Sequence, residues 1–313
     1  MSIINLFYVS IIIFGIALFI LGIRVMSSSF KKDLTFKIKS RINSLSSNKL
    51  AGVLIGIIMT GLLQSSSAVT LIVVSLVHGR VIRLYNSVPI IMGANIGTTI
   101  TAQLTAFGLG SSSLNLSFIT LMLFLLFRKN KSRFIPNVLL GFLLILLGLN
   151  TIPIFINKLE AVELLKILTI KLANNPVLGV LSGIMITSTI QSSSTGIAML
   201  QILSSSNIIT VSSCIPILLG QNIGTCVNTL IGSFATNKSG KRVAVIHTLF
   251  NISGVIMFIF LIKPLYYFVL QLAPYNPARQ IAYAHTIFNV LTTIILLPLS
   301  SVLVKISKKI IRD

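Results

Sequence analysis

Residues 52–67 read GVLIGIIMTGLLQSSS, and residues 179–194 repeat this stretch as GVLSGIMITSTIQSSS. Ten of the sixteen positions are identical, at a constant offset of 127. The same offset relates PIIMGANIGT at 89–98 to PILLGQNIGT at 216–225, with seven of ten positions identical. Self-similarity at a fixed distance indicates an internal duplication. We predict a first repeat over 1–134 (hairpin 50–78), a second over 135–262 (hairpin 176–206), and a C-terminal helix with a basic tail over 263–313.

The composition places these repeats in a lipid bilayer. Of the 313 residues, 54% are hydrophobic and 9% are charged. Soluble domains carry about 25% charged residues, so this chain has too little polar surface to cover itself in water. The formal charge of +21 alone would suggest nucleic-acid binding. The hydrophobicity excludes a soluble nucleic-acid binder and a disordered chain. We therefore expect an all-α integral membrane protein with no nucleic-acid partner.

The polar breaks leave two topologies open. A spanning helix needs about 20 apolar residues. The apolar arm before the first QSSS, 50–63, has 14 residues and the arm after it, 68–77, has 10. Either 50–77 is one crossing helix with a polar break, or it is a re-entrant hairpin with QSSS at its tip. Irregular backbone at membrane depth requires surrounding protein or a wet cavity.

The distribution of Lys and Arg separates these alternatives, because cytoplasmic segments carry an excess of both. With two hairpins and an external N-terminus, 20 of the 25 basic residues lie inside. With two crossing helices, the basic loop 128–133 would lie outside while 24–49 stayed inside. We therefore predict re-entrant hairpins and a cytoplasmic C-terminus. The seven expected spans are about 3–26, 88–109, 113–128, 135–152, 211–235, 243–262 and 281–304.

Each repeat then has an odd number of full spans, so the two copies are inverted. The first hairpin enters from the cytoplasm and the second from outside, which lets their tips meet near the midplane. Inverted repeats with helices broken at the midplane are the architecture of secondary transporters. We expect such a protein in the cytoplasmic (inner) membrane, crossing it several times.

The two tips offer both donors and acceptors. A helix that starts after Gln-Ser-Ser-Ser presents free N–H groups and a dipole that favour an anion. The serine hydroxyls add donors, and the same hydroxyls with the amide oxygens of Gln64 and Gln191 are acceptors. Hard cations such as sodium prefer oxygen ligands of this kind. An alternative is that these polar groups only hold helices together. We prefer this structural alternative for a further repeated motif, which reads His247-Thr-Leu-Phe-Asn251 and recurs as His285-Thr-Ile-Phe-Asn289.

The paired QSSS motifs, each followed by G-x-N-I-G-T, and the HTLFNISG stretch resemble the sodium/phosphate cotransporter type II family. The resemblance covers about 8–304 and implies sodium-coupled transport of inorganic phosphate, with sodium as the coupling ion and no cofactor. By motif, the implied phosphate residues are Gln64, Ser65, Ser66, Ser192, Ser193, Asn95 and Asn222. The implied sodium residues are Gln191, Ser192, Ser194, Thr225, Thr98 and Ser67, and no other metal is expected.

The chain departs from the family pattern in ways that affect coupling and regulation. Electrogenic animal members carry an aspartate soon after the first N-I-G-T, whereas 98–113 contains no acid. Many bacterial members end in a PhoU-like domain, so we count a separate PhoU-like regulator among the candidate partners, together with a second copy of the chain.

Two other functions stay open at this point. One is a carrier or exporter of another oxyanion, such as sulfate or arsenate, because hydroxyls and helix ends do not themselves specify phosphate. The other, remote alternative is an intramembrane serine hydrolase using His78, His247 or His285 as base. Such an enzyme needs a hydrogen bond between nucleophile and base, and the sequence near QSSS supplies no adjacent base. We therefore expect no enzymatic activity.

Overall fold

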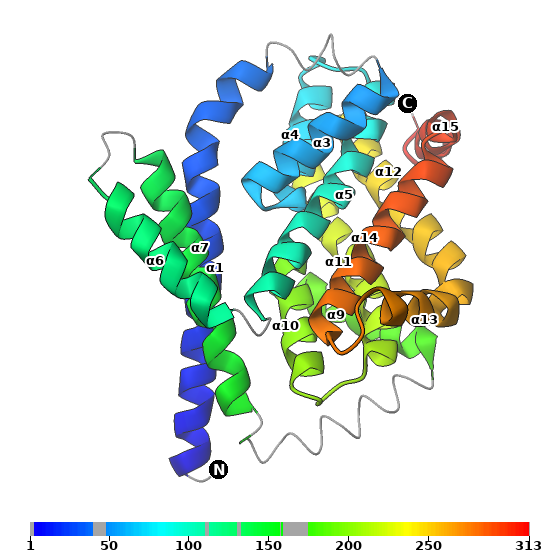
Figure 1. Cartoon of the computed structure of the whole chain (residues 1–313). Coiled ribbons are helices and arrows are strands. Elements are labelled where there is room, and N and C mark those ends of the chain that lie inside the picture. The colour runs from blue at the N-terminus through cyan, green and yellow to red at the C-terminus, as the bar shows by residue number, and fades with distance from the viewer. Residues whose placement is uncertain are drawn as a thin grey trace.

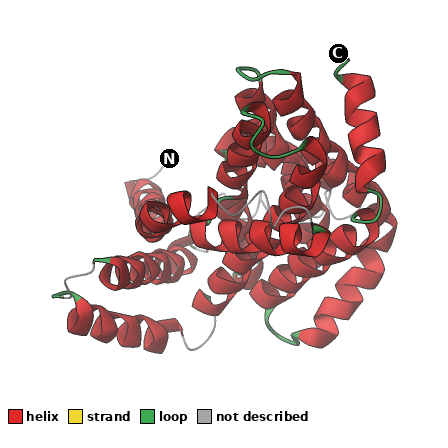
Figure 2. Ribbon diagram, turned by 90° about the horizontal axis from the view of Figure 1, so that it is seen from above, coloured by secondary structure: helices red, strands yellow, loops and turns green. Residues whose placement is uncertain are grey.

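The computed structural model describes residues 3–39, 48–109, 113–129, 133–156, 158 and 175–312, and every regular element in these ranges is helical. Figures 1 and 2 show the arrangement in two views. The first half comprises α1 (Ile3–Lys39), α3 (Lys49–Leu63), α4 (Ser66–His78), α5 (Leu84–Gly108), α6 (Ser113–Phe127) and α7 (Phe134–Ile156). The second half comprises α9 (Pro176–Ile190), α10 (Ser193–Ser205), α11 (Val211–Ser233), α12 (Lys238–Phe258), η1 (Ile259–Leu261), α13 (Ile262–Leu272), α14 (Pro277–Leu296) and α15 (Ser300–Ile310).

Several of these helices are long and apolar enough to cross a membrane. The described residues contain four such runs: Ile4–Met26, Phe134–Ile156, Val211–Ser233 and Lys238–Leu272. The number rises to six if two bent pairs, α5 with α6 (106°) and α14 with α15 (85°), each count as one span. The sequence-based count of seven treats α5 and α6 as two separate spans. The chain is thus an all-α, multi-pass membrane protein, as expected.

The C-terminal region differs from the prediction in two places. The expected span 281–304 is interrupted, because α14 ends at Leu296 and α15 starts at Ser300 in a new direction. Pro298 lies in the break; proline lacks an N–H group and disfavours helix in the residue before it. α15 exposes Lys305, Lys308 and Lys309. The second difference is α13, an extra helix in a segment expected to be an external loop.

Each QSSS segment is broken into two short helices. α3 ends at Leu63 and α4 begins at Ser66; α9 ends at Ile190 and α10 begins at Ser193. In Figure 1 the pair α3 and α4 lies in the upper half of the molecule, and α9 and α10 lie in the lower half. Helices of 13 or 15 residues are too short to span alone.

The repeated stretches pack as one unit in each half of the chain. α3 runs parallel to α5, and α9 runs parallel to α11, with backbones so close that added side chains would overlap them. The contacts in the first half pair Gly52 with Pro89, Gly93 with Val53, and Gly97 with Thr60. Those in the second half pair Gly179 with Pro216, Gly220 with Val180, and Gly224 with Thr187. The N-I-G-T glycines therefore allow α3 and α9 to pack closely against α5 and α11. Both α5 and α11 remain helical through these glycines.

The first helices of the two repeats, α1 and α7, pack against each other in opposite directions. A Cβ added to Gly15 would lie 3.2 Å from the carbonyl oxygen of Gly148, and one added to Gly22 would contact that of Gly141. The sequence offset of 126 relates Gly15 to Gly141 and Gly22 to Gly148. Gly15 thus faces Gly148, the equivalent of Gly22, and Gly22 faces Gly141, the equivalent of Gly15. Two antiparallel copies of one helix produce this pattern. Together with α6, this pair lies to one side of the remaining helices (Figure 1).

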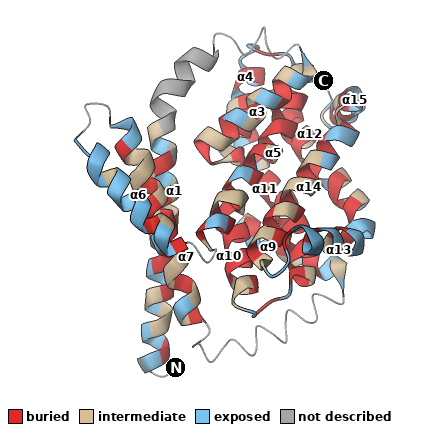
Figure 3. Cartoon of the chain, viewed as in Figure 1, coloured by how far each residue is buried: buried red, intermediate tan, exposed pale blue. Residues whose placement is uncertain are grey.

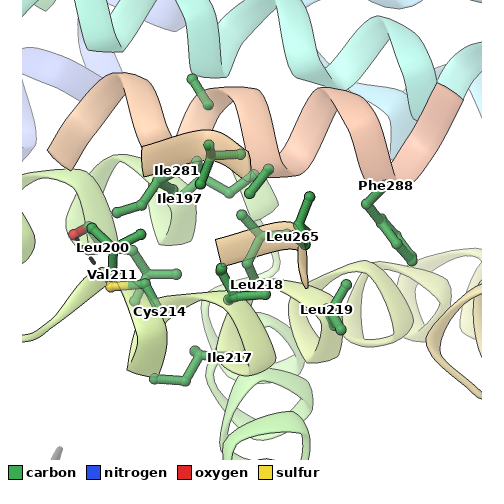
Figure 4. Close-up of a cluster of buried hydrophobic side chains, with 14 of the residues drawn as sticks. Ile197, Leu200, Val211, Cys214, Ile217, Leu218, Leu219, Leu265, Ile281 and Phe288 are labelled. Atoms are coloured by element: carbon green, nitrogen blue, oxygen red, sulfur yellow. Dashed lines mark hydrogen bonds between the residues drawn. The ribbon is translucent and has the colours of Figure 1, made fainter. Parts of the chain in front are cut away.

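Burial concentrates in the helices that follow the hairpins. Figure 3 shows α5, α11, α12 and α14 largely buried, whereas α6 and much of α1 are exposed. The exposed side chains of α6 are apolar, including Leu114, Phe118 and Leu126, which suits contact with lipid. One of the buried apolar clusters joins α10, α11, α13 and α14 around Cys214 and Leu218 (Figure 4).

Candidate functional site

The first tip is built around a glutamine in an unusual backbone conformation. Gln64 ends α3 with φ 51° and ψ 29°, the left-handed region that few residues other than glycine adopt. Its side chain is buried and donates from Nε2 to the carbonyl oxygen of Gly61. The Thr101 hydroxyl on α5 donates to Gln64 Oε1 at 2.7 Å. The left-handed residue and these bonds fix the reversal between α3 and α4.

The second tip repeats the backbone but not the side-chain contacts. Gln191 has φ 58° and ψ 22°, yet its side chain is exposed. Its carbonyl oxygen accepts from Asn228 Nδ2 on α11 at 3.2 Å. Asn228 is the offset-127 equivalent of Thr101. In both halves, the tip glutamine is hydrogen-bonded to the same position of its N-I-G-T helix, Thr101 or Asn228. Only the Gln191 side chain is left exposed and able to contact a ligand.

The first serine of each motif caps the helix that follows. Ser65 Oγ accepts from the N–H of Ala68 at 3.2 Å, and Ser192 Oγ accepts from that of Thr195 at 3.3 Å. Ser192 Oγ also lies 2.9 Å from Thr195 Oγ1. One of the expected free N–H groups per helix is therefore used by the cap. Ser65 Oγ keeps its own hydrogen for donation, whereas either Ser192 Oγ or Thr195 Oγ1 is the donor in the bond between them.

The remaining motif serines differ in exposure. Ser66 and Ser194 are buried, whereas Ser67 and Ser193 are half-buried. The N–H groups of Ser66 and Ser67, like those of Ser193 and Ser194, stand in the first turn of a helix, where intrahelical acceptors are lacking. Donors and the positive end of the dipole thus face the break in both halves.

The four predicted N-I-G-T residues are buried on α5 and α11. Asn95 Nδ2 has no hydrogen-bond partner among the described residues, whereas Asn222 Nδ2 donates to the carbonyl oxygen of Leu218 at 2.9 Å. Thr98 and Thr225 donate to carbonyl oxygens one turn back, at 3.2 and 2.9 Å. Both threonine oxygens therefore retain acceptor capacity, and Asn95 offers an unused donor.

The structure adds buried polar residues that the sequence reasoning missed. The side chain of Gln221 packs against Gly196, near the start of α10: a Cβ added to Gly196 would lie 2.7 Å from Gln221 Nε2. Gln221 Oε1 has no hydrogen-bond partner among the described residues. Thr60 and Thr187, at equivalent positions, carry hydroxyls that likewise have no described partner. Their equivalence was visible in the repeat, but their position beside the N-I-G-T glycines depends on helix packing.

The second arm of each hairpin packs on the helix of the other repeat. On α10, Gln201 is fully buried; its Nε2 donates to the carbonyl oxygen of Ala102 on α5 at 2.9 Å, and its Oε1 accepts from Thr105. On α4, Leu71 contacts Gly232 of α11. Each second arm therefore contacts the N-I-G-T helix of the other repeat, so both hairpins and both N-I-G-T helices pack in one assembly.

This assembly is neutral. Among the described residues, no three His, Cys, Asp or Glu side chains come together. The polar groups at the two tips are hydroxyls, amides and helix ends. The hydrolase alternative gains no support from the histidines. His78 Nδ1 accepts from the Asn237 N–H at 3.1 Å, and His247 Nδ1 lies 3.2 Å from Thr229 Oγ1. No tip serine is among the described partners of His78, His247 or His285.

Comparison with known proteins points to one family. The model of the family described as Na+/Pi-cotransporter matches residues 18–153 and 156–296. "Uncharacterized protein YqeW" of Bacillus subtilis is 28% identical over 286 residues, covering 91% of this chain and 92% of that protein. No solved structure matches the chain.

Two further relatives carry functional names. "Putative inorganic phosphate export protein YjbB" of Escherichia coli is 24% identical over 299 residues, 96% of this chain; the chain spans 55% of that relative's length. "Sodium-dependent phosphate transport protein 2A" of Ovis aries is 41% identical over 92 residues, 28% of this chain and 14% of that protein.

Proposed function

Because the chain belongs to the Na+/Pi-cotransporter family, a family of transporters, we propose that it carries inorganic phosphate across the cytoplasmic membrane with sodium as the coupling ion. The observation that carries this proposal is the pair of broken helices, whose neutral donors and acceptors lie at equivalent positions of two repeats. The antiparallel contact of α1 with α7 supports an inverted arrangement of those repeats.

Phosphate binding is assigned to the donors of the site. The hydroxyls of Ser65, Ser66, Ser192 and Ser193 and the N–H groups at the starts of α4 and α10 suit an anion. The unpartnered Asn95 Nδ2 adds a side-chain donor. Gln64 is already bonded to Gly61 and Thr101, so its role is to hold the tip. Asn222, the equivalent of Asn95 on α11, is assigned to the same phosphate site by motif.

Sodium binding is assigned to the oxygens of the second tip. Gln191 is exposed, and Ser192, Ser194 and Thr225 provide hydroxyl oxygens on the adjoining helices. The unpartnered Oε1 of Gln221 beside α10 is a further oxygen ligand. Thr98 and Ser67 are the corresponding candidates in the first repeat. Because no acid contributes, sodium offsets the charge of phosphate rather than that of the protein.

The proposed mechanism is alternating access. Sodium binds first and organises the tips, phosphate then binds to the serines and helix ends, and the loaded site opens to the other side. The N-terminus lies outside and the C-terminus inside, which places the basic residues mainly in the cytoplasm. One relative is named for export and another for sodium-dependent transport, so the direction of net flux is left to the gradients.

Purified protein in proteoliposomes tests this proposal. We expect uptake of labelled phosphate to be faster with an inward sodium gradient than with a matched potassium gradient, and to reverse when the sodium gradient is reversed. Equal flux in sodium and potassium would refute coupling. Excess unlabelled sulfate or arsenate is added in parallel. Stronger inhibition by either than by phosphate itself would favour the other-oxyanion alternative.

A further inference from the structure

Two matching stripes of side chains run along α12 and α14. His247 and Asn251 recur as His285 and Asn289 at an offset of 38, and the same offset relates Gly254 and Phe258 to Thr292 and Leu296. The helices run antiparallel and meet in the middle of these stripes, whereas His247 and Asn251 lie against α11. A Cβ on Gly254 would lie 3.0 Å from Thr292 Oγ1, and the Phe258 and Phe288 rings pack edge to face at 5.0 Å. We call the polar members of both stripes, together with Thr293, the α12–α14 seam.

The seam is buried and polar, but its polar atoms lack partners. Thirteen buried side-chain atoms in the described residues have no hydrogen-bond partner, and seven of them belong to the seam. They are His247 Nε2, Asn251 Oδ1, both ring nitrogens of His285, Asn289 Oδ1, Thr292 Oγ1 and Thr293 Oγ1. Each buried polar group left unpaired destabilises the folded protein. Because native proteins satisfy most such groups, a seam that stays dry is physically implausible.

The chemistry of the free atoms indicates what fills the seam. The amide nitrogens of Asn251 and Asn289 already donate to the carbonyl oxygens of His247 and His285, at 3.0 and 2.9 Å. Their free atoms are therefore acceptors only, which suits a small hydrogen-bond donor and not phosphate. An imidazole and a hydroxyl can each donate or accept. Water can both donate and accept, so separate water molecules satisfy all of these groups. One bulky ligand does not reach free atoms that are spread along two helices.

The seam adjoins the proposed ion site. Asn251 Nδ2 also donates to Cys226 Sγ at 3.3 Å, and His247 pairs with Thr229. Cys226 directly follows Thr225 on α11. On the other side, α14 bonds to α5 through Gln103 Nε2 and Thr286 Oγ1 at 2.9 Å. Polar side chains that face the interior of a membrane protein commonly mark a solvated path.

We propose that the α12–α14 seam binds water molecules and forms a wall of the aqueous route to the hairpin tips. The proposal rests on the proposed function only for what travels along the route. The binding of water itself follows from the unpartnered atoms. The seam is separate from the QSSS and N-I-G-T motifs and gives the two His-Thr-x-Phe-Asn motifs a role beyond packing.

Two native cysteines provide a matched test. Cys226 borders the seam, whereas Cys214 is equally buried but lies in the apolar cluster of Figure 4. The wild-type protein in proteoliposomes is treated with a small water-soluble methanethiosulfonate, and modification is followed by mass spectrometry. We expect Cys226 to react at least about tenfold faster than Cys214, because the thiolate reacts only where water reaches it. Equal rates would overturn the proposal.

Isosteric substitutions separate a solvent wall from simple packing. Thr292→Val with Thr293→Val removes two unpartnered hydroxyls at nearly constant volume. We expect the melting temperature to be unchanged or higher, while Cys226 modification and phosphate flux both fall by about fivefold or more. Thr120→Val on α6, whose hydroxyl bonds only its own helix, is the control and should change neither.

The outcomes distinguish the two proposals. If Cys226 reacts rapidly and the valine variant slows it, but no phosphate moves in any protein, the seam stands and the proposed substrate fails. If phosphate moves but the variant leaves both flux and Cys226 modification unchanged, the seam is only packing and this inference is wrong.

Discussion

Gln64 and Gln191 share a backbone conformation but not a side-chain role. Left-handed φ values of 51° and 58° cost about 1–2 kcal/mol in a residue with a side chain. At Gln64 the strain is offset by two buried hydrogen bonds. At Gln191 the exposed side chain makes no hydrogen bond to a described residue, and the proposed sodium contact is the role that we assign to it.

Glycine substitutions distinguish these roles. Gln191→Gly relieves the backbone and loses no described side-chain bond, so we expect the free energy of unfolding to change by less than about 1 kcal/mol. Gln64→Gly leaves the Thr101 hydroxyl without its acceptor, and we expect a loss of about 1–3 kcal/mol. Thermal unfolding in detergent measures both. If Gln64→Gly were as stable as Gln191→Gly, the bond to Thr101 would not support the tip.

Serine substitutions test the phosphate contacts. Ser66→Ala and Ser193→Ala should each raise the KM for phosphate by about tenfold, since a hydrogen bond to a charged group is worth about 1.5–3 kcal/mol. Ser65→Ala and Ser192→Ala should do so too, and should also cost about 1 kcal/mol of stability through the lost cap. Flux at varied phosphate concentration provides the measurement. Ser75→Ala, far along α4, is the control; unchanged KM in all four tip variants would refute the assignment.

At the scale of elements, each hairpin's first arm is joined to the helix that follows it in the chain. α3 with α5, and α9 with α11, approach until the backbones touch, and equivalent pairs are in contact in both halves, as in Gly52 with Pro89 and Gly179 with Pro216. Only glycine permits this approach. The arm and the N-I-G-T helix therefore behave as one rigid body.

Alanine substitutions test this packing. A Cβ on Gly93 or Gly220 would overlap the carbonyl oxygen of Val53 or Val180, and backbone cannot move aside as a side chain can. We expect Gly93→Ala and Gly220→Ala each to lower stability by about 3 kcal/mol or more. Gly79→Ala, whose nearest atom would be 3.4 Å away, should change it by less than about 0.5 kcal/mol. Yield and melting temperature after purification report the effect, and a stable Gly93→Ala protein would contradict the close approach.

The sequence predicts elements better than contacts. The breaks at Gln64 and Gln191 are predictable because their apolar arms are too short to span, and Pro298 carried a usable signal for the end of α14. The start of α13 carried a usable signal as well, because Pro264 stands in its first turn, where proline is tolerated. Gln221, Thr60 and Thr187 could not be recognised, because their relevance arises only when α3 and α9 lie beside α5 and α11. The different partners of Thr101 and Asn228 likewise depend on side-chain geometry.

At the scale of the whole molecule, the duplicated halves reproduce even local backbone features. The turns that follow α4 and α10 contain Arg80 and Asn207, both left-handed, with φ values of 58° and 57°. These residues are equivalent at offset 127, and both are exposed. In an inverted arrangement, the two equivalent turns lie on opposite sides of the membrane.

Labelling of these turns tests the inversion. Arg80→Cys and Asn207→Cys are each reacted in intact cells with a bulky, membrane-impermeant maleimide, which the buried Cys214 and Cys226 should not meet. Because basic residues mark the cytoplasmic side, we expect Asn207→Cys to react from outside and Arg80→Cys only after permeabilisation. If both react from the same side, the repeats are not inverted.

The left-handed glutamine has a consequence for membrane topology. If Gln64 and Ser65 turned to helical dihedrals, Lys49 to His78 would become one straight rod about 45 Å long at 1.5 Å per residue, well beyond the roughly 30 Å of hydrocarbon. The rod would deliver the turn at Arg80 to the opposite face and reverse the sidedness of everything that follows. The backbone angles of two adjacent residues thus decide between a hairpin and a crossing, and the duplicated chain makes this choice twice.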